Sequence, residues 1–121
     1  MEKEVDVITL CKRLIELTKQ EKCVWKDTSE TNRYKLILKN GSVEIYHFYP
    51  SQFDIMNKGY YEVSLYDKSQ YRYASYKSSN EIEEYYKTFK ELYVSIIKYL
   101  ESLRRRKIAL LFDELDEKDK T

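Results

Sequence analysis

The residues with the clearest chemical potential are the single histidine, His47, and the two cysteines, Cys11 and Cys23. Together with one carboxylate they could supply the four ligands of a tetrahedral zinc site. Helical spacing places Cys11 on an apolar stripe, however, and strand alternation places His47 on the core side of a hairpin. Because burial in a hydrophobic core accounts for both residues, the sequence predicts no metal site.

No catalytic set is recognisable around His47. With only two glycines, Gly41 and Gly59, the chain has no glycine-rich loop of the kind that cradles a phosphate. It also has no Gly-x-Ser-x-Gly elbow that would present a serine nucleophile. A nuclease built from scattered acids such as Asp54 and Glu62 stays open, although neither acid is followed two residues later by lysine. The sequence predicts no catalytic residues, no cofactor and no enzyme activity.

Tyrosine is unusually frequent, with thirteen copies in 121 residues. Its ring is rigid and apolar while its hydroxyl is polar, and tyrosine is therefore enriched at binding surfaces. Strand alternation gathers an aromatic patch on the sheet face turned away from the helices. This aromatic patch consists of Ile37, Tyr46, Phe48, Tyr60 and Tyr66. We expect it to bind a protein partner or a second copy of the chain; the alternatives are cross-strand pairs that only stabilise the sheet, and a stacking platform for single-stranded nucleic acid.

One marked basic cluster is present, formed by Arg104, Arg105, Arg106 and Lys107. At the C-terminal end of a helix such residues interact favourably with the helix dipole, and we take this as their main role. Binding of an anion or of nucleic acid is the alternative. Five acidic residues follow between positions 113 and 119 and would screen the cluster.

The apolar patterns predict one α+β domain over residues 1–121, with helices segregated from an antiparallel sheet. Apolar residues at three- and four-residue spacing predict helices over about 5–20 and 81–104. Alternating apolar residues predict four strands, over about 33–39, 42–49, 60–66 and 71–77. We expect a two-layer sandwich in which both helices pack on one face of a four-stranded antiparallel meander.

Two further segments leave alternatives open. Residues 23–29 form either a brief edge strand or an extended connection that buries Trp25. Residues 108–116 have helical spacing and either continue the second helix or turn back as a short third helix. From about residue 116 onward we expect a charged, frayed tail.

The turns predict how the strands pair. Asn-Gly at residues 40–41 is typical of a type I′ hairpin turn, which would pair Leu38 with Val43 and Tyr34 with His47. The second hairpin turns around residues 67–70, and its register stays open. A loop of two or four residues sends Ala74 and Tyr76 towards the core, whereas a loop of three sends Tyr71 and Tyr73 there.

The connection through residues 50–58 is apolar for a loop because it contains Phe53, Ile55 and Met56. We expect it to fold back over an edge of the core or to form a recognition surface. Ser-Ser-Asn at residues 78–80 supplies candidate caps for the second helix.

The composition favours a folded protein without a global electrostatic preference. Hydrophobic residues make up 42% of the chain, and 22 Lys and Arg against 21 Asp and Glu leave a net charge of +1. Charges interrupt every apolar run well before the roughly 18–20 residues that span a bilayer, and the acidic start is unlike a signal peptide. Since two cysteines are no disulfide framework, we expect a reducing, cytoplasmic location.

Core spacing and turn residues follow a familiar order through residues 14–19, 25–29, 41–45, 61–67 and 89–93. This order resembles a class of small uncharacterised proteins from bacteria, their phages and mobile elements. The resemblance spans about residues 10–97 and implies the fold and a microbial, cytoplasmic setting, but no activity. After the second hairpin turn, where we expect a glycine, this chain has Gln70.

Taken together, these patterns predict a non-catalytic protein-binding module. We expect a small microbial or phage-encoded cytoplasmic accessory protein of the inhibitor, immunity or adaptor type, acting through the aromatic patch. One alternative is single-stranded nucleic-acid binding through the same sheet plus the basic cluster. Another is a small-molecule sensor with a pocket between sheet and helices.

Overall fold

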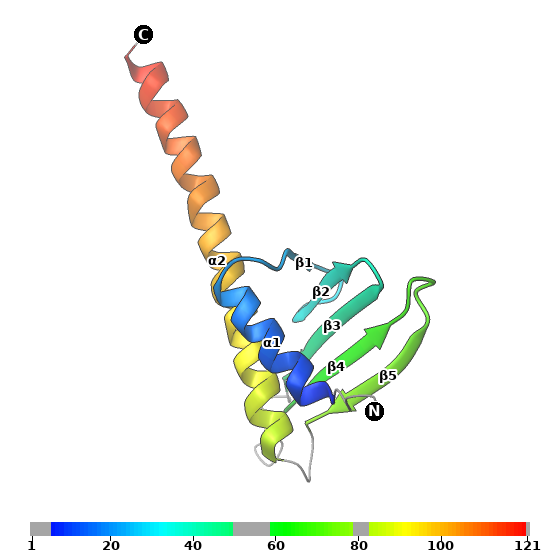
Figure 1. The fold of residues 1–121 in the computed structure, drawn as a ribbon. Helices are drawn as coiled ribbons and strands as arrows, with labels where there is room; N and C mark the ends of the chain where they lie inside the picture. Colours follow the sequence, from blue (N-terminus) through cyan, green and yellow to red (C-terminus); the bar gives the residue numbers. More distant parts are fainter. Residues whose placement is uncertain (1–5, 50–58, 79–82, 121) are drawn as a thin grey trace.

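The computed structural model describes residues 6–49, 59–78 and 83–120 and has an α+β fold (Figure 1). Within these ranges, two helices accompany one antiparallel sheet whose five strands follow in sequence order. The elements are α1 (Val7–Lys19), β1 (Trp25–Asp27), β2 (Arg33–Leu38), β3 (Gly41–Phe48), β4 (Tyr60–Tyr66), β5 (Arg72–Lys77) and α2 (Glu83–Asp119). The predicted fold class is confirmed, whereas the predicted number of four strands is wrong.

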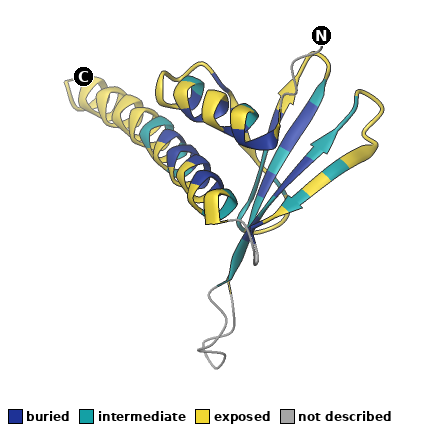
Figure 2. Cartoon of the chain, turned by 60° about the horizontal axis from the view of Figure 1, so that its bottom comes forward, coloured by how far each residue is buried: buried dark blue, intermediate teal, exposed yellow. Residues whose placement is uncertain are grey.

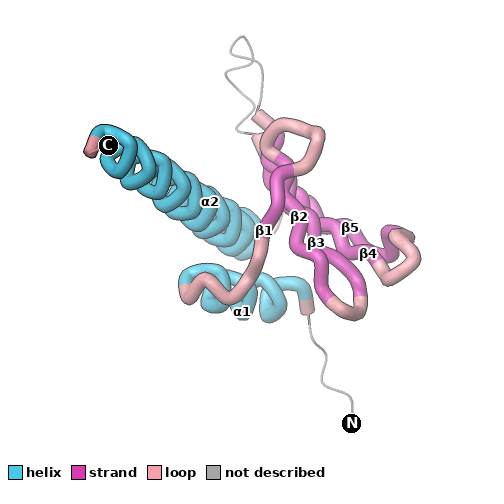
Figure 3. The backbone as a smooth tube through the Cα atoms, turned by 90° about the horizontal axis from the view of Figure 1, so that it is seen from above, coloured by secondary structure: helices cyan, strands magenta, loops and turns pink. Residues whose placement is uncertain are grey.

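Both helices lie on the same side of the sheet, which leaves the other sheet face open (Figure 3). The core between the two layers is well packed. Ile45 and Val63 from the sheet meet Phe89, Leu92 and Ile96 from α2, and none of these side chains is exposed. We call the sheet face towards the helices the inner face and the opposite one the outer face.

The additional strand is β1, the edge strand that sequence reasoning left open. It pairs antiparallel with β2 and places Trp25 opposite Leu36 on the inner face. Three residues are too few for alternation to be recognised in a sequence, and burial of Trp25 holds the strand in place. The strand lengthens the meander at the β2 edge.

The first hairpin is shifted from the predicted register by two residues. Leu38 pairs with Gly41 and Leu36 with Val43, so the two-residue loop is Lys39-Asn40 and the predicted type I′ turn at Asn40-Gly41 is wrong. The predicted pair of Tyr34 with His47 is likewise absent, since these residues lie opposite Ile45 and Tyr61. Because side chains alternate with a period of two, a two-residue shift leaves every residue on its predicted face.

Gly41 lies against the backbone of the neighbouring strand β4, which leaves no room for a side chain. Its φ is +150°, and a Cβ placed on it would lie 2.2 Å from the carbonyl oxygen of Tyr66 on β4. The neighbouring strand therefore approaches too closely for any side chain.

The second hairpin resolves the open register in favour of Ala74 and Tyr76 on the inner face, opposite Leu65 and Val63. A bulge interrupts the pairing at Leu65 and Tyr66. The loop contains Gln70 with a φ of +68°, a conformation that favours glycine. The backbone expected at this position is present although the residue is not glycine.

Helix α2 is continuous over 37 residues, so the segment 108–116 continues it. The expected frayed tail is wrong up to Asp119, because the helix persists to that residue. A run of arginine, lysine and leucine contains no helix breaker, which explains the continuity. The C-terminal part of the helix extends away from the rest of the domain (Figure 1).

Helix α1 begins at an Asp6 cap, whose carboxylate accepts a hydrogen bond from the backbone N–H of Thr9 at 2.7 Å. This hydrogen bond holds the pKa of the Asp6 carboxyl below its usual value. The expectations for Phe53, Ile55 and Met56, and for Ser79 and Asn80 as caps, lie outside the described residues.

Candidate functional site

The outer sheet face carries all five residues of the aromatic patch. Tyr46 lies opposite Glu62, and Phe48 lies opposite Tyr60, on neighbouring strands β3 and β4. Ile37 and Tyr66 flank Ser42 on the same face. The four rings are partly buried by their neighbours, and Ile37 is the most exposed residue of the patch. Strand alternation thus placed the patch on one surface as expected.

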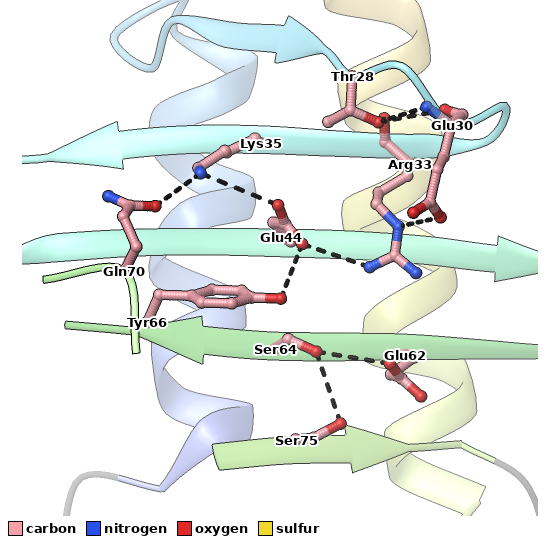
Figure 4. A network of polar contacts seen from close by, with 10 residues as sticks. All are labelled: Thr28, Glu30, Arg33, Lys35, Glu44, Glu62, Ser64, Tyr66, Gln70 and Ser75. Carbon is pink, nitrogen blue, oxygen red and sulfur yellow. Dashed lines mark hydrogen bonds and ion pairs between the residues drawn. The ribbon is translucent and has the colours of Figure 1, made fainter. Parts of the chain in front are cut away.

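A carboxylate, Glu44, lies at the centre of this face and joins three strands (Figure 4). Its side chain accepts hydrogen bonds from the Arg33 guanidinium at 3.3 Å and from the Tyr66 hydroxyl at 3.0 Å. The Lys35 ammonium is 4.0 Å away and donates to the side-chain oxygen of Gln70 at 3.0 Å. Glu44 therefore connects β2 and β4 directly and, through Lys35, the β4–β5 loop.

The ion pair at the centre of this network is shielded from water. The Glu44 side chain is 14% exposed and that of Arg33 19% exposed, so solvent screens their attraction less than that of a surface pair. Burial opposes the charge on Arg33, but Glu30 and Glu44 outweigh it and raise the guanidinium pKa. Burial, followed by the hydrogen bond to Glu44, raises the pKa of the Tyr66 phenol.

The ring faces of the patch are covered by other side chains of the same surface. The Arg33 guanidinium lies 4.7 Å from the centre of the Tyr46 ring, and the Lys35 ammonium lies 5.8 Å from that of Tyr66. The Phe48 and Tyr60 rings stack at 5.0 Å with an interplanar angle of 16°. The surface is consequently an array in which rings contact cations or other rings.

A second polar group continues the array towards β5. Glu62 lies 3.9 Å from the Lys77 ammonium, which also lies 5.2 Å from the Tyr60 ring centre. The Ser64 hydroxyl is 3.5 Å from both the Glu62 carboxylate and the Ser75 hydroxyl (Figure 4). Glu62 is thus paired with Lys77 rather than projecting singly from the outer face.

The basic cluster is not part of this surface. Arg104, Arg105, Arg106 and Lys107 belong to α2, which lies on the inner side of the sheet (Figure 3). The expectation that the basic cluster lies at the end of a helix is wrong, because α2 continues to Asp119. Arg106 forms an ion pair with Glu21, while Arg104 and Lys107 line a groove of about 500 Å³ beside β1. The structure therefore separates the two sets of residues that the nucleic-acid alternative combines.

His47 lies on the inner face within a cluster of tyrosine rings. Its ring stacks on Tyr61 at 4.1 Å and contacts the edge of Tyr93 at 5.1 Å, with Tyr49 at 4.0 Å. Burial, with a smaller contribution from Lys90, lowers the pKa of His47, and burial raises the pKa of Tyr61 to about 12. The Nδ1 atom of His47 is buried and has no hydrogen-bond partner among the described residues.

The cysteines do not join His47. Both are free and buried, and burial raises the pKa of Cys11 to about 12, which makes its thiol a poor nucleophile at neutral pH. The described residues contain no group of three potential metal ligands from histidine, cysteine, aspartate and glutamate.

Sequence reasoning missed the polar network that organises the patch. Strand alternation is enough to place Arg33, Lys35 and Glu44 on one face, but the contacts of Glu44 with Tyr66 and of Lys35 with Gln70 depend on the strand register and on the loop conformation. Lys35 pairs directly with Glu44 in the observed register, but the predicted register places Tyr46 opposite Lys35 and so conceals this pair of opposite charges.

Comparisons with family models, with curated proteins and with solved structures found no match to this chain. Neither α1 nor α2 combines the length and the apolar character needed to cross a membrane, within the part of the chain that the structure describes. The structure thus defines an α+β domain with an open, aromatic outer sheet face.

Proposed function

We propose that this chain is a non-catalytic protein-binding module whose outer sheet face contacts the partner. The observation that carries the proposal is the array in which Glu44 fixes Arg33 and Tyr66 while cations cover the rings of Tyr46 and Tyr60. Aromatic residues and arginine are the residue types enriched at protein interfaces.

Preorganisation is the physical reason why such an array suits protein binding. Ordering flexible side chains on association costs roughly 0.5–1.5 kcal/mol for each one. Here Arg33 and Tyr66 are already held by Glu44, so a partner would find them in one arrangement. Exposed Ile37 at the margin of the patch adds apolar area without a polar group that would have to be desolvated.

The same array argues against a stacking platform for nucleic acid. Bases stack on free ring faces, but cations lie over the rings of Tyr46, Tyr60 and Tyr66. The carboxylates of Glu44 and Glu62 would also lie beside the phosphates of a bound strand. We therefore favour a protein as the partner, in a microbial or phage, cytoplasmic setting, with the chain acting as an inhibitor, immunity factor or adaptor.

The experiment begins with the tagged full chain in lysate of the cells that naturally express it. Retained proteins are identified with and without nuclease treatment, and the affinity of the purified partner is then measured for variants. The double variant Tyr46→Ser/Tyr60→Ser removes two central rings. The control is Tyr71→Ser, which removes an exposed tyrosine from the β4–β5 loop.

The proposal requires a discrete partner that survives nuclease and whose affinity falls at least about tenfold in the double variant, with Tyr71→Ser close to wild type. Retention that disappears with nuclease and falls steeply with salt would replace it by nucleic-acid binding. Equal affinity of wild type and double variant would show that the partner uses another surface.

A further inference from the structure

The last turns of α2, from Ile108 to Asp119, project beyond the rest of the domain (Figure 1), past the ion pair of Arg106 with Glu21. Every residue from Arg104 to Asp119 is exposed, whereas the first half of α2 alternates between exposed and buried residues because one of its faces packs in the core (Figure 2). Single helices of this length are marginal in water, and most helices in proteins are stabilised by packing of an apolar face.

This segment does have an apolar face. Ile108, Leu111, Phe112 and Leu115 follow at three- and four-residue spacing, and their exposed fractions lie between 46% and 62%. We call these four residues the helix stripe. A continuous apolar stripe on a projecting helix is typical of an interface with another helix.

Charge is distributed unevenly along the same segment. Residues 104–107 are all basic, whereas from position 113 onward five of seven residues to Asp119 are acidic, namely Asp113, Glu114, Asp116, Glu117 and Asp119. Among the described residues, only Arg106 of the basic cluster has an ion-pair partner, and none of the five acids has one. Both ends of the segment therefore present charge that is available to a partner.

We propose that a second copy of this chain covers the helix stripe, forming an antiparallel helix pair about a two-fold axis between Leu111 and Phe112. In this arrangement Ile108 of one chain lies opposite Leu115 of the other, and Leu111 lies opposite Phe112. The basic end of each segment then lies beside the acidic end of its partner. One surface is complementary to itself, as a two-fold interface requires.

Helical positions assign the individual charge pairs. Arg104 lies four residues before Ile108 and Asp119 four residues after Leu115, so both are in line with the helix stripe. In the antiparallel pair Arg104 therefore meets Asp119 of the second copy. Arg105 and Asp116 flank the helix stripe on one side, and Lys107 and Glu114 flank it on the other. In the antiparallel pair Arg105 therefore comes near Asp116 of the second copy and Lys107 near Glu114, with an offset of about 3 Å along the helix axis, and each pair occurs twice.

The charges also exclude the competing arrangements. A parallel pair would place four basic residues beside four basic residues and five acids beside five acids, which is repulsive. An anionic membrane surface gains nothing from the segment as a whole, since residues 104–119 contain five basic and five acidic side chains. The outer sheet face is not involved, so this proposal stands independently of the proposed function.

The first test is sedimentation of the purified full chain over a range of concentrations. We expect a reversible monomer–dimer equilibrium with a dissociation constant on the order of micromolar, because the interface is a single helix pair. The double variant Leu111→Ser/Phe112→Ser should raise this constant at least about tenfold. The matched control, Leu110→Ser, removes an equally exposed leucine (67%) from the other side of the helix and should change it less than about twofold.

Charge exchange tests the pairing directly. Arg105→Glu alone reverses the charge at this position and should weaken the dimer. Adding Asp116→Arg to the same chain should restore the dimer. The introduced glutamate and the introduced arginine of the second copy meet only in an antiparallel pair, so the rescue is specific to this arrangement. High salt should weaken the wild-type dimer without abolishing it, since the helix stripe is apolar.

Disulfide crosslinking tests the orientation. Chains with Arg104→Cys mixed with chains with Asp119→Cys should form a mixed disulfide, whereas Arg104→Cys alone should not crosslink. In the antiparallel pair two copies of residue 104 are about 22 Å apart, beyond the reach of a disulfide. The native cysteines are buried and remain in place.

Three results would overturn the proposal. A chain that stays monomeric at all concentrations has no such dimer, and its helix stripe would belong to a different protein. Efficient crosslinking of Arg104→Cys with itself would show a parallel pair. A dimer that persists in Leu111→Ser/Phe112→Ser but is lost in Tyr46→Ser/Tyr60→Ser would place self-association on the outer sheet face.

Discussion

The indole nitrogen of Trp25 donates a hydrogen bond to the hydroxyl oxygen of Thr18 at 2.9 Å, deep in the core. Thr18 is 1% exposed and Trp25 is 2% exposed. The bond joins the edge strand β1 to the last turn of α1 and satisfies an indole N–H that would otherwise be buried without an acceptor. It accounts for the placement of a three-residue strand that has little pairing of its own.

We therefore expect Thr18→Val to destabilise the protein by about 1–3 kcal/mol, because the shape is kept while the acceptor of Trp25 is lost. Thr18→Ser is the control, since it keeps the hydroxyl and loses one methyl group, at a cost of about 0.8 kcal/mol. Urea unfolding followed by the fluorescence of the single tryptophan measures both the free energy and the environment of Trp25. A valine variant that is more stable than the serine variant would contradict the assignment.

Gly41→Ala should be among the most destabilising single-methyl substitutions in this chain. The new Cβ would lie 2.2 Å from the Tyr66 carbonyl oxygen at a φ of +150°, so β3 and β4 would have to separate. We expect a loss of at least about 2 kcal/mol in the free energy of unfolding. Asn40→Ala, at the neighbouring turn position, should stay within about 0.5 kcal/mol of wild type, and equal effects of the two substitutions would refute the close approach.

The limits of sequence reasoning follow from these particular residues. Alternation assigned Tyr46 and Tyr66 to the outer face correctly even though the hairpin register was shifted by two, because the face depends only on whether a position is odd or even. In the observed register Gly41 pairs with Leu38 and lies against β4, a tertiary contact that no local turn pattern contains. Alternation can place Glu44 on a face but cannot identify its contacts. Tyr66 donates a hydrogen bond to Glu44, and Gln70 accepts one from the neighbouring Lys35, but both residues come from other segments of the chain.

The partly buried His47 predicts a pH dependence of stability. Burial lowers the pKa of folded His47 below its ordinary value of 6.5, so the unfolded chain binds a proton more readily than the folded chain. Stability from this residue is complete above about pH 6.5 and is lost as the pH falls from there through the lowered pKa of the folded state.

The measurement is urea unfolding of wild type and His47→Phe between about pH 7.5 and about pH 5.5. Phenylalanine keeps an aromatic ring between Tyr49 and Tyr61 but carries no titratable group. We expect the free energy of unfolding to fall with decreasing pH more steeply in wild type than in the variant. Parallel pH profiles would show that His47 is protonated equally well in both states.

Glu44 tests whether the outer face is a preorganised surface. Glu44→Ala removes the acceptor of Arg33 and Tyr66 and leaves both groups partly buried, so we expect a cost of about 1–3 kcal/mol in the free energy of unfolding. The control is Glu30→Ala, because Glu30 also contacts Arg33 but is itself exposed. A surface pair of that kind contributes about 0–1 kcal/mol.

The same two variants separate structure from binding. Nuclear magnetic resonance should show the aromatic rings of Tyr46 and Tyr66 losing their fixed environment in Glu44→Ala but not in Glu30→Ala, because only Glu44 connects the three segments. If the outer face binds a partner as a preorganised surface, the affinity of Glu44→Ala must fall although the substitution removes no ring. Unchanged ring signals in Glu44→Ala would show that the rings hold one another without the carboxylate, and the rigidity of the patch would then rest on stacking alone.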